Sequence, residues 1–213
     1  MSYVVKNVTA LWPKIDKPYR FDNDENRSVP CNATEDGAAY ELAFKMSKED
    51  AKEFWSFIED SWKQYLKTNG KKPEKMKNMP FYEDKEDPTQ LVFKAKIKAA
   101  YSGQPTKKPT VFNAANQAID DPEFMLTTGS TVNVAVQAVP YMTGMASGVS
   151  LRLRAVQLID LAETAAGASP FDVDKAAVEK SIENLKVYAE APVKEKAEAP
   201  AEDKYGFDTD VPF

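Results

Sequence analysis

Two segments of the chain, residues 91–101 and 149–158, alternate apolar and cationic side chains, and this period of two constrains the fold more than any other feature. Successive side chains of a β-strand point to opposite faces, so each segment predicts a strand with one face in a core and one in solvent. The core positions are Phe93, Ala95 and Ile97, then Leu151, Leu153 and Ala155. The solvent positions are Lys94, Lys96 and Lys98, then Arg152 and Arg154. Val156 and Leu158 break the alternation, which predicts a β-bulge in the second strand.

Further strands are expected before and between these two segments. They are rich in β-branched and aromatic residues and are separated by turn-forming sequences. The expected strands are residues 3–13, 39–44, 110–113 and 130–142. Residues 14–36 are rich in Asp, Asn and Pro, and residues 71–88 are charged and contain three prolines, so both predict long loops.

One helix is predicted between residues 47 and 68, with Ser47 as its cap, Asp50 in its first turn and Asn69-Gly70 at its end. Its apolar residues recur at helical spacing, at Ala51, Phe54, Trp55, Ile58, Trp62, Tyr65 and Leu66. We therefore assign both tryptophans of this helix to the core. The order of strands, helix and strands predicts a mainly β fold, an OB-like barrel of five or six strands with one inserted α-helix; a β-sandwich is the alternative.

The character of the chain changes near Ala165, where Ala, Glu, Lys and Pro replace the large apolar residues. Residues 169–213 hold 11 of the 33 acidic and 6 of the 28 basic side chains, which leaves 22 of each for residues 1–168. The net charge of −5 therefore belongs to the end of the chain and does not argue against a basic groove on its body. We expect an OB-fold domain over residues 1–168, a short helix and flexible linker over 169–201, and a disordered acidic tail over 202–213.

The absence of histidine and the single cysteine, Cys31, restrict the chemistry of the chain. A His-based catalytic triad, an HExxH zinc site and a zinc ribbon are excluded, and no nucleotide-binding glycine loop occurs. Asp120-Asp121 before Pro122 predicts a turn rather than a magnesium site. We therefore expect no enzymatic activity, no cofactor and no metal. No apolar run reaches the length of a membrane span, and the one cysteine cannot form an internal disulfide, so a cytoplasmic protein without a membrane partner is expected.

The two cationic strands predict a surface for single-stranded DNA. Five lysines, one tyrosine and no acidic residue lie between residues 91 and 108. Ammonium groups neutralise phosphates without reading sequence, and aromatic rings stack on any base. The alternative for the lysines alone is protection of an edge strand against aggregation, but a second cationic strand favours a shared basic surface. The predicted DNA-binding residues are Lys94, Lys96, Lys98, Tyr101, Lys107, Lys108, Phe112, Tyr141, Arg152 and Arg154.

Several other residues near these strands have weaker signals. Trp12, Tyr19 and Phe21 are further candidates for base stacking. Gly144 and Gly148, between the last two strands, are assigned to the geometry of a hairpin turn rather than to DNA contact.

The last residues of the chain combine acids, a proline and a terminal phenylalanine. Such a peptide offers a partner protein a carboxylate, an apolar ring and flanking negative charge, which a hydrophobic pocket with a basic rim can capture. A tail that only improves solubility is the alternative. The predicted partner-binding residues are Asp208, Asp210, Val211, Pro212 and Phe213.

Residues 208–213 resemble the acidic, Pro-Phe-ended tip of bacterial single-stranded DNA-binding proteins. Residues 93–96, 148–157 and 169–171 resemble phage replication proteins that pair one OB-fold with an acidic tail. The resemblance implies a protein that coats single-stranded DNA during replication, recombination and repair. It also implies that the tail recruits the replicative DNA polymerase or helicase-primase and folds back on the cationic groove when DNA is absent. Exchange of tails between two protomers of a homodimer, and action in the cytoplasm of a phage host, belong to the same resemblance.

Two other functions are alternatives to the coating of single-stranded DNA. A protein-interaction scaffold or recombination mediator would use the tail, while its basic strands would only resist aggregation. A double-strand DNA binder is disfavoured because the one good helix uses its length on a buried face and is not available as a recognition helix. Salt-dependent binding to unpaired DNA separates these hypotheses.

Overall fold

The computed structural model describes residues 2–162 of the chain. The expected linker over 169–201, with its short helix, and the expected tail over 202–213 lie outside the described residues. No helix within residues 2–162 combines the length and the apolar character needed to cross a membrane.

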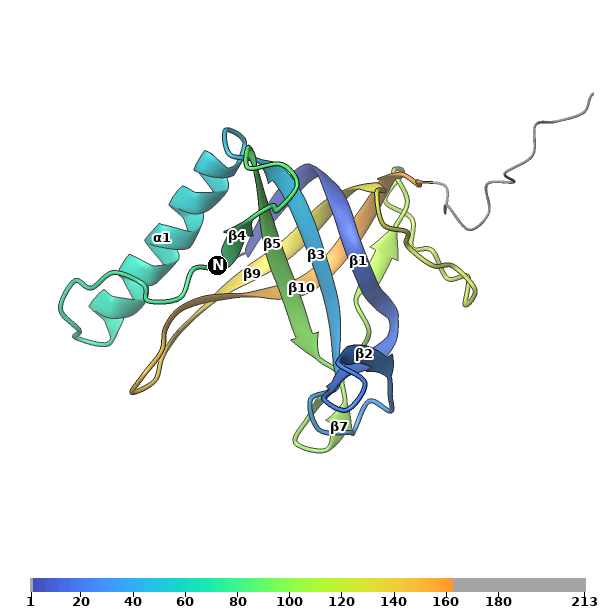
Figure 1. Ribbon diagram of the computed structural model, residues 1–213, viewed down its shortest axis with the longest axis horizontal. Coiled ribbons are helices and arrows are strands. Elements are labelled where there is room, and N and C mark those ends of the chain that lie inside the picture. The colour runs from blue at the N-terminus through green and yellow to red at the C-terminus, as the bar shows by residue number, and fades with distance from the viewer. Residues whose placement is uncertain (1, 163–213) are drawn as a thin grey trace, which may run out of the picture. The chain divides into compact units, whose positions relative to one another are not determined.

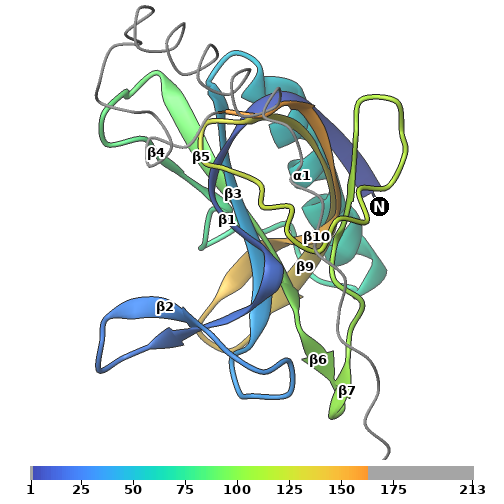
Figure 2. The ribbon, with the colours of Figure 1, turned by 90° about the vertical axis from the view of Figure 1, so that its right-hand side faces the viewer.

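Five strands close into a barrel (Figures 1 and 2). In order around the barrel they are β1 (Ser2–Asp22), β3 (Ala39–Ser47), β5 (Gln90–Lys98), β10 (Ser147–Asp160) and β9 (Thr131–Met142). The last of these pairs again with the first, and the contact of β5 with β10 is parallel while the other neighbours are antiparallel. The expected OB-like barrel with an inserted helix is confirmed, and the closed ring excludes the alternative of two separate sheets.

Short strands extend the barrel at its margins. They are β2 (Arg27–Pro30), which pairs with β1; β4 (Phe81–Glu83), which pairs with β5; β6 (Ala100–Tyr101) and β7 (Gln104–Pro105), which form a hairpin; and β8 (Thr110–Phe112), which runs parallel to β10. The predicted loop over 71–88 therefore contains a strand.

Helix α1 (Ala51–Thr68) packs its apolar face on the barrel. Phe54, which is fully buried, meets the inward rings of β3 and β5: its ring centroid lies 5.0 Å from that of Phe93, and Phe93 lies 5.7 Å from Phe44. Such aromatic pairs contribute roughly 0.5–1.5 kcal/mol each beyond the burial of their area. Trp62 is buried as expected, whereas Trp55 is half-buried with its edge against Phe81.

The ends of α1 differ in one detail from the expectation. Asp50, rather than Ser47, is the N-cap residue. Ser47 holds this residue from outside the helix, because its hydroxyl donates to the Asp50 carboxylate at 2.6 Å and accepts from the Asp50 N–H at 3.1 Å. The helix ends at Asn69-Gly70 as predicted, and the positive φ of Gly70, 61°, is the conformation that favours glycine there.

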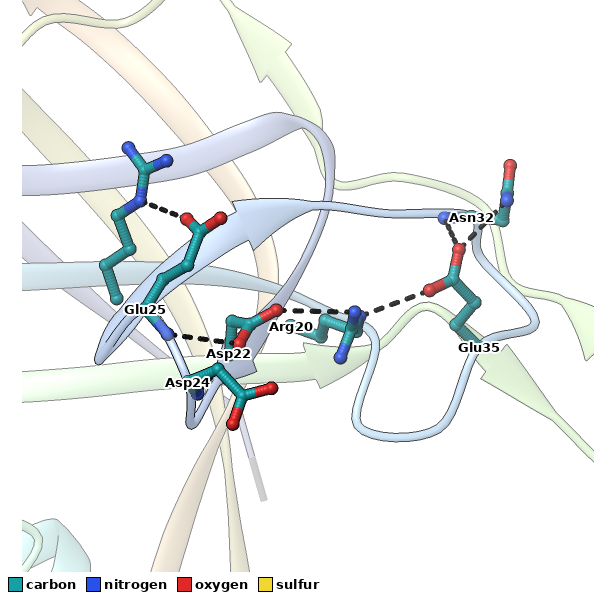
Figure 3. Close-up of polar contacts among 7 residues, drawn as sticks. Arg20, Asp22, Asp24, Glu25, Asn32 and Glu35 are labelled. Carbon is teal, nitrogen blue, oxygen red and sulfur yellow. Dashed lines mark hydrogen bonds and ion pairs between the residues drawn. The ribbon is translucent and has the colours of Figure 1, made fainter.

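Of residues 14–36, which were predicted to be a loop, residues 14–30 belong to a long β-hairpin. β1 continues to Asp22 and β2 returns beside it. Figure 3 shows how Arg20 joins the end of this hairpin to the following loop, with ion pairs to Asp22 at 3.5 Å and to Glu35 at 3.2 Å. Backbone N–H groups of Glu25 and Asp24 lower the pKa of Asp22, and the backbone N–H of Asn32 does the same for the pKa of Glu35. Both carboxylates are therefore ionised acceptors at neutral pH.

The predicted bulge in the last strand is present. The pairing of β10 with β9 shifts by one residue between Leu153 and Ala155, so two residues of β10 oppose one of β9. After this shift Val156 is buried, and Ala155, which was expected in the core, is only half-buried. Arg152 precedes the shift and Arg154 lies at it, and both are exposed as predicted.

Gly148 is required by a close approach of the backbone rather than by turn geometry. The N–H groups of Lys77 and Asn78 donate to the carbonyl of Ser147 at 3.0 and 2.9 Å, which holds the chain before β4 against β10. A Cβ at Gly148 would lie 2.5 Å from the carbonyl oxygen of Asn78.

Replacement of Gly148 with alanine is therefore expected to lower the free energy of unfolding by roughly 1–3 kcal/mol, the usual cost of overpacking. Urea unfolding measures this change. Gly144→Ala is the matched control, because nothing lies within 4 Å of a Cβ built at that position. Equal unfolding midpoints for the two variants would contradict the role assigned to Gly148.

Candidate nucleic-acid interface

An open groove runs along the outer side of β5 and faces the hairpin of β9 and β10. Its volume is about 1020 Å³. Figure 1 shows how this hairpin extends beyond the barrel, while β5 runs toward β6 and β7. Residues 78–82, which lead into and form β4, line the remaining side. Because the groove is open rather than enclosed, it suits an extended chain better than a small molecule.

Both cationic strands contribute to the groove. The parallel contact of β5 and β10 pairs Ala95 with Leu151, which brings the outward residues that flank this pair onto one surface. Seven of the ten predicted DNA-binding residues line the groove: Lys94, Lys96, Lys98, Tyr101, Tyr141, Arg152 and Arg154. The lysines and arginines are exposed, and Phe93 and Ala95 of β5 are fully buried as predicted. Ile97, which was also expected in the core, is half-buried and lines the groove.

β5 is an edge strand over only part of its length. β5 pairs with β3 from Gln90 to Lys98. On its other side it pairs with β4 and then, at Ala95, with β10. The strand therefore has neighbours on both sides only as far as Ala95, and protection of an edge remains an alternative for Lys96 and Lys98.

The five cationic side chains of the groove are not equally free to bind phosphate. Lys94 donates to the Glu41 carboxylate, with Nζ 2.7 Å from Oε1. The other four cations form no ion pair with any acidic residue between Ser2 and Ala162; they are Lys96, Lys98, Arg152 and Arg154. These four are the groups most ready to take phosphate oxygens.

Aromatic side chains stand at both ends of this cationic surface. Tyr101 is 76% exposed and begins a two-residue turn in which Ser102 and Gly103 both have positive φ, the geometry of a tight hairpin. Tyr141 lies opposite Gly148 in the β9–β10 hairpin and is half-buried. Rings in such positions offer stacking faces for bases that leave the strand.

The chain was compared with family models, with curated protein sequences and with solved structures. No family model and no curated protein sequence matches the chain. Solved structures do match. The single-stranded DNA-binding protein from bacteriophage Enc34 in complex with ssDNA has 16% identity and a TM-score of 0.56, over 77% of this chain and 89% of that one. Gp2.5, a single-stranded DNA-binding protein encoded by bacteriophage T7, has 20% identity and a TM-score of 0.54, over 80% and 98%.

This chain has the fold of phage single-stranded DNA-binding proteins. At such low sequence identities the likeness concerns the fold. The C-terminally truncated Enc34 protein has the same fold, with 18% identity and a TM-score of 0.53 over 76% of this chain and 87% of that one. The phage-type OB-like barrel expected from the sequence is therefore confirmed.

Three of the predicted DNA-binding residues do not line the groove. Lys107 and Lys108 line a second cavity of about 170 Å³, where Asp16, Asp120 and Asp121 are also found. Phe112 is half-buried in β8. Trp12, Tyr19 and Phe21, all in β1, are likewise absent from the residues that line the groove.

Several residues that line the groove were not predicted from the sequence. Met79, Phe81 and Tyr82 belong to the segment expected as a loop, yet all three line the groove. Phe81 and Tyr82 are brought there by the pairing of β4 with β5, and Met79 shortly precedes this strand. Tyr82 is 49% exposed and is a third ring available for stacking. Among residues 2–162, no group of acidic residues and cysteine is arranged to hold a metal ion.

Proposed function

We propose that this protein binds single-stranded DNA largely independently of sequence, and coats and protects it during DNA replication, recombination and repair. One observation carries the proposal: four cations without acidic partners in the described chain share one open groove with three exposed or half-buried tyrosines. The face of the second and third strands of an OB-fold is a common site for oligonucleotides, and β5, which lines the groove, is the third strand of this barrel. The Enc34 protein with the same fold was solved in complex with ssDNA.

The groove supports such binding through two kinds of contact. The ammonium and guanidinium groups neutralise phosphates, and phosphates are the same whatever the base. The tyrosines stack on base faces, which are accessible in a single strand and already stacked in a duplex. Neither contact reads the hydrogen-bonding edge of a base, so we expect only modest sequence preference.

Titration with oligo-dT, oligo-dC and a mixed sequence of equal length tests this independence of sequence. Dissociation constants that agree within about tenfold would support it. A preference of about 10³-fold or more for one sequence, which is typical of specific DNA-binding proteins, would contradict it.

We also propose that the acidic tail, residues 202–213, recruits replication proteins and competes with DNA for the groove. The tail's partners would be the replicative DNA polymerase and the helicase-primase, and its contacts would be made by Asp208, Asp210, Val211, Pro212 and Phe213. Exchange of tails between two protomers would give a homodimer, and the setting of this activity would be the cytoplasm of a phage host. The support is the charge distribution, since residues 169–213 carry 11 acidic and 6 basic side chains. A tethered acidic peptide has a high effective concentration at a basic groove and yields to a longer polyanion.

Deletion of residues 202–213 is therefore expected to tighten binding to short single-stranded DNA at low salt, with a smaller gain at high salt because ions screen the tail as they screen DNA. Fluorescence titration of the intact and truncated chains measures the gain. Unchanged affinity at low salt would overturn the competition, and the recruiting role would then need separate evidence from polymerase binding.

A further inference from the structure

Glu41 does not itself line the groove, but its carboxylate contacts one of the lysines that do. It belongs to β3, directly opposite Lys96 of β5 on one side and Lys14 of β1 on the other. Its Oε1 atom accepts from Lys94 at 2.7 Å and lies 3.9 Å from Nζ of Lys14. The Glu41 side chain is only 18% exposed, so its carboxylate depends on these two cations for much of its stabilisation.

Lys14 is held in position for a second role. Its Nζ donates to the hydroxyl of Ser28 at 2.7 Å, which ties it to the β1–β2 hairpin, and its own side chain is 24% exposed. It does not line the groove, whereas Lys94 does and is 54% exposed. One carboxylate oxygen thus lies between a groove lysine and a lysine outside the groove.

We propose that Glu41 is a resident competitor of DNA phosphate for Lys94, and that Lys14 keeps the carboxylate neutralised when DNA takes Lys94. This inference rests on the proposed binding of single-stranded DNA. A phosphate that approaches Lys94 must displace the Glu41 carboxylate, which costs free energy because a partly buried carboxylate loses a partner. The nearby Lys14 limits that cost, since it reaches the same oxygen atom.

The expected consequence is a lower affinity than the number of cations would give. A protein that coats DNA and must later leave it benefits from such weakening, because affinity differences between related complexes arise mostly in the dissociation rate. In the unaltered chain four cations are free for phosphates at once, and Lys94 becomes the fifth only at the cost of displacing Glu41; without the Glu41 charge that cost is absent.

Replacement of Glu41 by glutamine, which keeps the shape of the side chain, is expected to tighten binding to oligo-dT about three- to tenfold at low salt. The slope of log affinity against log salt should stay nearly unchanged, because Lys94 neutralises the same phosphate in both proteins and only the cost of displacing the carboxylate is removed. Glu83→Gln is the matched control. Glu83 pairs with Lys48, neither residue lines the groove, and the change in net charge is the same.

Lys14 provides the decisive second variant. Lys14→Met is expected to weaken binding several-fold in the unaltered background, because Glu41 then holds Lys94 as its only partner. In the Glu41→Gln background the same change should have an effect of less than about twofold, since no carboxylate remains to be neutralised. This non-additivity is the signature of coupled residues. A residue that contacted DNA directly would have the same effect in both backgrounds.

The outcomes separate the inference from the function on which it rests. No binding of oligo-dT by the unaltered protein would overturn both. Binding by the unaltered protein with equal or weaker affinity in a folded Glu41→Gln variant would overturn the inference alone. Equal effects of Lys14→Met in the two backgrounds would overturn the role given to Lys14.

Discussion

Replacement of both Tyr101 and Tyr141 by alanine is expected to weaken binding to oligo-dT about 1000-fold, while the salt dependence of the affinity stays the same. Base-aromatic stacking is worth roughly 1–3 kcal/mol per base, so two rings at about 2 kcal/mol each give this loss. Because neither ring is charged, the number of phosphates neutralised should not change. Fluorescence titration at several salt concentrations measures both quantities.

The matched control is replacement of the same two tyrosines by phenylalanine, which retains the rings and removes only the hydroxyls. We expect affinity near that of the unaltered protein. Tyr141 also lies opposite Gly148, so unfolding of each variant must be compared before affinities are interpreted. A folded alanine variant that binds within about threefold of the unaltered chain would contradict stacking at these positions.

Replacement of both Lys96 and Arg152 by glutamine should weaken binding to the same DNA about 30-fold at moderate salt. This loss assumes that each exposed phosphate contact contributes roughly 1 kcal/mol to the binding free energy. The slope of log affinity against log salt should become less steep by about 1.4, the value for two phosphates on a single strand. Titrations at four or more salt concentrations determine this slope.

The control for this pair is Lys52→Gln with Lys63→Gln on α1. Both residues are exposed, neither lines the groove, and the net charge changes by the same amount. Little change in affinity or slope is expected for this control. If both pairs weakened binding equally, the effect would belong to the net charge and not to the groove.

The period-two pattern predicted much of the fold and site because it reports a local property of the backbone. Alternation placed Lys94 and Lys96 outward and Phe93 inward without knowledge of the neighbouring strands. The broken alternation at Val156 predicted the bulge in β10 for the same reason. The apolar face of α1 likewise follows from spacing within the helix itself.

The errors concern pairing between segments that are distant in sequence. Tyr82 reaches the groove because β4 pairs with β5, and a three-residue strand within a charged, proline-containing segment has no distinctive pattern. Lys107 and Lys108 follow Tyr101 closely in sequence, but the β6–β7 hairpin reverses the chain between them and they line another cavity. The neutralisation of Lys94 depends on the register of β3 against β5, which no local pattern contains.

The most direct test of the proposed function compares oligo-dT with a duplex of equal length, titrated against the intact chain at several salt concentrations. We expect clear preference for the single strand and a slope of log affinity against log salt near −3.5, the value of about −0.7 for each of five neutralised phosphates, with Lys94 released by Glu41. Equal affinity for the duplex, or binding to the single strand that does not change with salt, would contradict a cationic stacking groove as the site of DNA binding.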